Sequence, residues 1–82
     1  MSDEIQRVVV KTYTTSPTTL SGLNTFSVLN GSINPLTISV NNGTDSVALT
    51  SGQTLMLSAS TGFVLPDIVL SGTAMSAYVI ST

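Results

Sequence analysis

The spacing of the six glycines is the feature of this chain that most restricts its fold. They are Gly22, Gly31, Gly43, Gly52, Gly62 and Gly72. Successive glycines are 9, 12, 9, 10 and 10 residues apart, and most of them follow a Ser, Thr or Asn. Glycine adopts positive φ angles without steric cost, so the chain reverses most easily at these points. Turns at about every 8–12 residues, with short apolar stretches between them, are typical of an all-β sandwich or barrel.

Between the glycines, apolar and polar residues alternate with a period of two, which indicates strands with one buried side. No apolar stripe with helical spacing occurs, so no substantial helix is expected. The pattern predicts a small antiparallel β-sandwich or jelly-roll-like barrel of about seven strands. A hairpin turn of type I′ is predicted at Asn30-Gly31, and another turn over residues 41–44. The predicted strands cover residues 5–13, 25–29, 36–40, 46–50, 54–58, 62–70 and 74–81.

The first 19 residues differ from the rest of the chain. Residues 5–13 are rich in β-branched side chains and predict a strand. Residues 14–19 contain Pro17 and no apolar side chain, which indicates a loop or an extended arm. Residues 20–24 are ambiguous. We therefore predict a single domain, with an N-terminal strand and arm over residues 1–19 and a β-sandwich core over residues 20–82.

The apolar side chains expected to face inward make a thin core. Burying one of them contributes about 1.5–3 kcal/mol, against about 1.5 kcal/mol of ordering cost for every residue. The chain has no cysteine that could add a disulfide, so we expect further surface to be buried against a neighbouring copy. The expected inward residues are Val8, Val10, Phe26, Val28, Leu36, Ile38, Val40, Val47, Leu49, Leu55, Leu57, Phe63, Leu65, Ile68, Leu70 and Val79.

Charge is scarce in this chain. Charged residues make up 7% of it, against about 25% in typical soluble domains, and the net charge is −2. Without a basic cluster, neither nucleic acid nor an anionic membrane surface is an expected partner. No apolar stretch approaches the ~18 residues of a membrane helix. The acidic start, Met1 to Glu4, does not resemble a secretory signal, so we expect synthesis and assembly in a cytoplasm.

The residues that usually carry catalysis are few. Histidine and cysteine are absent, and Lys11 is the single lysine available for a Ser–Lys dyad. Asp45 and Asp67 would form a glycosidase-like pair only if they converged, and each is more simply explained as a loop residue. The oxygen-rich residues 41–45 weakly resemble a calcium loop, but the turn already explains them. We expect no enzyme activity, no catalytic residue, no metal and no cofactor.

Two tyrosines and the N-terminal segment are the expected contact residues. Tyr13 and Tyr78 are candidates for interface anchors, because aromatic side chains are enriched in interfaces. The segment 5–19 is extended and would add a strand to the sheet edge of a neighbour. The predicted interface residues are Val8, Val10, Tyr13, Pro17 and Tyr78.

The part of the chain from Leu36 onward resembles a module of tailed-bacteriophage virion proteins. The shared features are a strand ending at Asn42-Gly43, a tight turn at residues 51–53, a Gly-aromatic-apolar stretch at residues 62–65, and an I-x-L-x-G segment at residues 68–72. Members are small β-sandwiches that act as homo-oligomers in capsid decoration, head–tail joining or fibre bases. The resemblance covers a little over half of the chain and carries no reactive residue with it.

These observations predict a non-enzymatic structural protein of a virion, assembled as a ring or trimer and in contact with other virion proteins. A carbohydrate-recognition module of a fibre or cell-surface assembly is the alternative. In that case Tyr13 or Tyr78 would stack on a sugar ring, since the chain contains no tryptophan. An enzyme is the third possibility, against which the missing histidine and cysteine weigh most.

Overall fold

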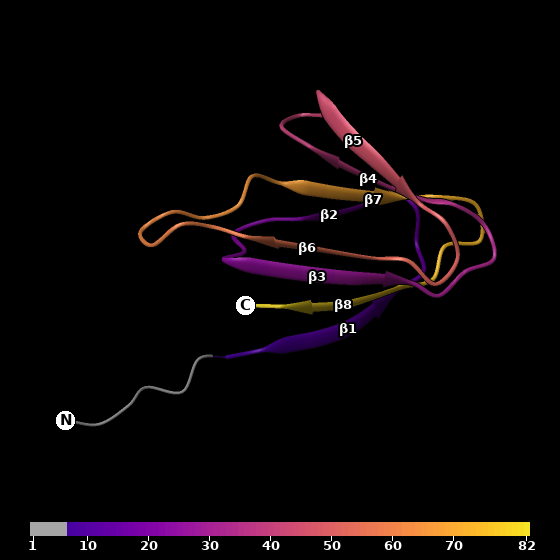
Figure 1. Ribbon diagram of the computed structural model, residues 1–82, viewed down its shortest axis with the longest axis horizontal. Coiled ribbons are helices and arrows are strands. Elements are labelled where there is room, and N and C mark those ends of the chain that lie inside the picture. Colours follow the sequence, from indigo (N-terminus) through magenta and orange to yellow (C-terminus); the bar gives the residue numbers. More distant parts are fainter. Residues whose placement is uncertain (1–6) are drawn as a thin grey trace.

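The computed structural model describes residues 7–82, which form eight β-strands and no helix (Figure 1). The strands make two four-stranded antiparallel sheets, which we name sheet A and sheet B. Sheet A has the order β1-β8-β3-β6, and sheet B has the order β2-β7-β4-β5. The strands are β1 (Val9–Tyr13), β2 (Thr18–Leu20), β3 (Thr25–Asn30), β4 (Leu36–Val40), β5 (Asp45–Leu49), β6 (Thr54–Ser58), β7 (Ile68–Ser71) and β8 (Ala77–Ser81). The predicted small antiparallel β-sandwich is confirmed.

The core lies between the two sheets and follows the alternation of the strands. In β3, β7 and β8, every second side chain is buried, as with Phe26, Ile68 and Val79. Half-buried apolar side chains of other strands and loops pack against this cluster. Met75 and Ala77 also belong to it, although they were not among the expected inward residues. The buried apolar residues are Phe26, Val28, Leu36, Ile38, Leu49, Ile68, Leu70, Met75, Ala77 and Val79.

Four of the expected inward residues are exposed, so that part of the prediction was wrong. In β1, Tyr13 points inward and packs against the core, so Val10, an odd number of residues away, points outward. Val8 precedes the strand and is also exposed. A shift of one residue in phase exchanges the two sides of a strand. Phe63 lies in the irregular connection between β6 and β7, where Leu65 reaches the core instead. Val47 points inward on edge strand β5 but remains 43% exposed.

The first 19 residues contribute to both sheets. Of the predicted strand 5–13, residues 9–13 form β1, and residues 5 and 6 lie outside the described residues. The loop predicted for residues 14–19 was partly wrong, because Thr18 and Thr19 belong to β2. β1 pairs with β8, and β2 pairs with β7 of the same chain. Both strands are therefore edge strands of the sandwich formed with residues 20–82.

The two Asn-Gly dipeptides differ in structure. Asn41, Asn42 and Gly43 have positive φ angles of 55°, 57° and 81°, and they form the predicted turn between β4 and β5. A type I′ turn at Asn30-Gly31 was a wrong prediction, because such a turn needs positive φ at both residues and neither has it. Asn30 instead ends β3 as a buried residue, whose side-chain amide donates to the carbonyls of Asn34 and Leu49 at 2.9 Å each.

Gly31 is required for a close approach rather than for a turn. A Cβ atom added to Gly31 would overlap the ring of Tyr78, which lies against the glycine backbone. Gly31 N–H also donates to the carbonyl of Ser76 at 2.8 Å. The glycine therefore lets the end of β3 and the Tyr78 ring of β8 pack together.

Candidate interaction surface

The outward side of sheet A is the surface whose composition departs most from that of a solvated sheet. We name it face A; it consists of the outward side chains of all four strands. They lie in rows that follow the strand register: Val10 is paired with Ile80, Ile80 with Ser27, and Ser27 with Met56. A second row runs through Thr12, Tyr78, Leu29 and Thr54. Face A comprises Val10, Thr12, Thr25, Ser27, Leu29, Thr54, Met56, Ser58, Tyr78 and Ile80.

Large apolar side chains on face A are open to solvent. Met56 is 78% exposed, Val10 75% and Ile80 51%. None of the ten residues of face A is charged. A contiguous exposed apolar surface on a small domain marks a contact site more often than single exposed apolar residues do.

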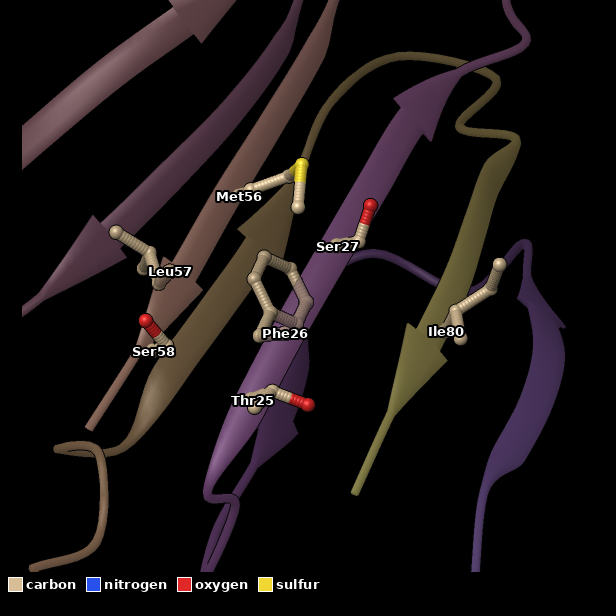
Figure 2. Close-up of a pocket in the computed structure, with 7 residues that line it drawn as sticks. All are labelled: Thr25, Phe26, Ser27, Met56, Leu57, Ser58 and Ile80. Carbon is tan, nitrogen blue, oxygen red and sulfur yellow. The ribbon is translucent and has the colours of Figure 1, made fainter. Parts of the chain in front are cut away.

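Two shallow hollows lie on face A. The larger, of about 470 Å³, has the outward side chains of Met56, Ser27 and Ile80 along it, and Figure 2 shows them on three neighbouring strands. The second, of about 220 Å³, is bordered by Val10, Leu29 and Tyr78 among others. The residues that line them are apolar or carry hydroxyl groups, except for Lys11 at the second hollow, so most of this surface suits an uncharged partner.

The predicted interface residues occupy different places. Val10 and Tyr78 come together on face A, on the paired strands β1 and β8. Val8 is exposed beside the start of β1, and Pro17 is exposed in the connection between β1 and β2. Tyr13 is half-buried against the core, with the Nζ atom of Lys11 at 5.2 Å from the centre of its ring. Tyr13 is thus held by its own chain.

Sequence reasoning missed Leu29, Met56 and Ile80 as members of this surface. The signal was available in the alternation: each lies one residue away from an inward residue, at a position where a solvated sheet carries a polar side chain. Met56, between the inward Leu55 and Leu57, is the clearest case. An apolar residue with the outward phase is therefore the pattern that points to a contact surface.

The two aspartates considered for catalysis or metal binding lie at a turn and in a loop, as their structural interpretation predicted. Asp45 begins β5, and its Oδ2 atom accepts a hydrogen bond of 2.7 Å from the side-chain amide of Asn41. Asp67 is exposed in the connection before β7. Among residues 7–82, no three acidic, histidine or cysteine side chains gather as metal ligands would. In the same residues, no buried side-chain nitrogen or oxygen lacks a hydrogen-bond partner.

Comparison of the chain with protein-family models, with curated proteins and with solved structures gave no match. Within residues 7–82, no helix has the length and apolar character needed to cross a membrane.

Proposed function

We propose that this protein is a non-enzymatic structural component of a bacteriophage particle that acts by assembling with copies of itself and with other virion proteins. Capsid decoration, head–tail joining and the base of a fibre are the positions that its resemblance to phage modules suggests. The observation that carries the proposal is face A, where Val10, Met56 and Ile80 are exposed on an uncharged sheet. Covering these side chains would remove apolar area from water, which is the main favourable term in association.

We assign a second copy of this chain as the partner of face A. A charged surface repels its own copy, whereas the ten residues of face A carry no charge to repel each other. Two copies of the face would place Ile80, Leu29 and Tyr78 against side chains of the same kind. A pair related by a two-fold axis satisfies this, since such an interface uses the same patch on both subunits.

The size of face A sets the expected strength of this contact. Four strands about 4.8 Å apart and five residues long, at about 3.3 Å per residue, give a flat area of about 300 Å² per copy. Stable interfaces bury about 800 Å² per partner, so face A alone supports a weak dimer. A stable assembly needs a second contact, either with another copy or with another virion protein.

The test compares one added charge on each outer side of the sandwich. Ile80→Glu places a carboxylate on central strand β8 of sheet A. Its matched control, Ser39→Glu, places the same group outward on central strand β4 of sheet B. We expect Ile80→Glu to weaken self-association at least tenfold, because an unpaired carboxylate would be desolvated in the contact, and Ser39→Glu to leave it unchanged. Sedimentation velocity over a range of concentrations measures the effect.

Two results would contradict the proposal. One is a wild-type protein that sediments as a monomer at every concentration. The other is a loss of association that is equal for Ile80→Glu and Ser39→Glu while circular dichroism shows both to be folded. The placement in a virion has its own measurement, which is mass spectrometry of purified particles from the virus that encodes the chain; particles without the protein would refute it.

A further inference from the structure

The two edges of sheet A differ in a way that suits one to the other. β1 and β6 are its outermost strands, and each pairs with one strand of the same chain, β8 and β3. Within residues 7–82, no strand pairs with the other backbone edge of either one, so each edge can accept a further strand. On face A, the most exposed apolar residues of β1 and β6 are Val10 and Met56, so the apolar character of the face extends to both edges.

Beside β6, the space between the two sheets is open. A groove of about 190 Å³ lies there, between β6 of sheet A and strands β4 and β5 of sheet B. Val47 and Leu57 contribute apolar walls, and Val47 is 43% exposed although it points to the inner side of its sheet. Asp45 lies on the wall of the groove, and its carboxylate already accepts one hydrogen bond, from Asn41. The groove is thus apolar with one negative charge.

β1 has the complementary chemistry. The only two basic residues of the chain are Arg7, just before β1, and Lys11 within it. Val9 and Lys11 share the inward phase of β1, and Val8 and Val10 share the other. A strand with this sequence presents an apolar and a basic side chain on one side, and further apolar side chains on the opposite side.

We infer that β1 of one copy adds to the free edge of β6 in a second copy. In this arrangement Val9 covers the apolar wall of the groove, and Lys11 supplies a cation for Asp45. Val10 extends the row on face A that ends at Met56. Main-chain hydrogen bonds between the edges provide affinity, and the alternate side chains provide the match, as in other cases of strand addition.

This contact joins two different edges, so it is head-to-tail. In a pair joined this way, the copy that contributes β1 keeps its β6 edge free, and the other copy keeps its β1 edge free. Repeating the contact with further copies gives a closed ring or an open filament. The inference rests on the proposed function, because it supplies the second contact that the small area of face A requires. It also differs from the two-fold contact through face A, which by itself stops at a dimer.

The first experiment reverses the charges of the pair. Lys11→Glu and Asp45→Lys are each expected to weaken assembly beyond the dimer about tenfold, because attraction becomes repulsion. The double variant, which exchanges the two charges, is expected to recover most of the wild-type assembly. Asp67→Lys is the control, since it makes the same charge change outside the residues that line the groove. Native mass spectrometry separates monomer, dimer and larger species.

The second experiment uses the absence of cysteine from the natural chain. The pair Val9→Cys and Val47→Cys, placed in one chain, is expected to form disulfides between copies and to give a ladder of covalent oligomers. Within one copy the two positions are on strands at opposite ends of different sheets, beyond the Cα separation of about 7 Å that a disulfide allows. Val9→Cys with Ala48→Cys is the control, because Ala48 points to the opposite side of β5.

The outcomes separate the inference from the proposed function. Assembly beyond a dimer, together with charge rescue and the ladder, supports the inference. A wild-type protein that stops at a dimer, or larger assemblies that neither charge reversal nor the cysteine pair affects, overturns the inference and leaves the proposed function standing. A wild-type monomer at every concentration overturns both.

Discussion

The two outer faces of this sandwich are made by the same alternation but carry different side chains. Face A presents large apolar residues such as Met56 and Ile80. The outward side of sheet B, which we name face B, presents small side chains and mostly hydroxyl groups. Face B consists of Thr19, Thr37, Ser39, Ser46, Ala48, Val69 and Ser71. Both sheets cover the same core, so the core does not explain the difference.

This contrast separates the positions of a strand that serve folding from those that are available for contact. Inward residues such as Phe26 in sheet A and Leu70 in sheet B are fully buried, and folding of one chain requires them. At outward positions, threonine or serine is sufficient for a sheet that faces water, and face B carries mostly these residues. Large apolar residues at the same outward positions cost solubility unless something covers them. We therefore expect face A, rather than face B, to be the side on which this protein contacts a partner.

The largest expected effect concerns Gly31, which lies under face A. Gly31→Ala places a methyl group where the Tyr78 ring lies, and its φ angle is outside the left-handed region, so the cost is one of overpacking. We expect a loss of about 1–3 kcal/mol in the free energy of unfolding. In a Tyr78→Ala background the same change should cost much less, because the ring is no longer there to be displaced. Urea unfolding of the four proteins of this cycle measures the coupling.

The cycle also tests how rigidly face A is built. If Gly31→Ala costs the same with and without the Tyr78 ring, the contact between them does not hold that ring in place, and face A would be less defined than we describe. Face B has no comparable contact between a glycine and a side chain. Its outward side chains are small, and within residues 7–82 a Cβ atom added to a glycine would collide with a side chain only at Gly31.

The Gly31 result also marks what the sequence could predict. The turn at Asn42-Gly43 was predicted because its residues need positive φ, a local property that a dipeptide carries with it. The same reasoning failed at Asn30-Gly31. Here the glycine makes room for the ring of Tyr78, 47 residues away, and the side chain of Asn30 donates a hydrogen bond to the carbonyl of Leu49. Contacts with residues that are distant in the sequence cannot be predicted from the two residues of a dipeptide.

The candidate surface was predictable only in part for a related reason. Alternation identified inward residues well in the central strands β3 and β4, where neighbours on both sides fix the phase. It gave the wrong side for Val10 on edge strand β1. It gave the right side for Val47 on edge strand β5, which is nevertheless 43% exposed because β5 has a paired strand on one side only. The three-residue β2 was missed because so short a strand, with two threonines, shows no period.

The second prediction makes face B resemble face A. Replacing both Thr37 and Ser39 by valine keeps the strand preference of β4, so we expect the free energy of unfolding to change by no more than about 0.5 kcal/mol. Self-association should nevertheless rise, because the face gains exposed apolar area. Static light scattering over a range of concentrations measures this change. An increase in stability without any increase in association would show that apolar outward residues in this sheet serve folding. The apolar residues of face A would then be no sign of a contact surface.

The smallest expected effect is that of salt, and it separates the contact through face A from the contact between edges. Raising the ionic strength would screen the proposed pairing of Lys11 with Asp45 of a second copy, and an exposed pair of this kind contributes about 0.2–1 kcal/mol. In the Ile80→Glu variant, which would keep only the proposed edge contact, assembly should weaken by about 1.4- to fivefold between low and high salt. In the Lys11→Glu variant, which keeps only face A, salt should not weaken assembly, because that face has no charge to screen. Analytical ultracentrifugation of both variants at matched concentrations makes the measurement. Equal salt dependence in the two would mean that the same contact holds both assemblies, and the assignment of separate roles to the face and to the edges would be wrong.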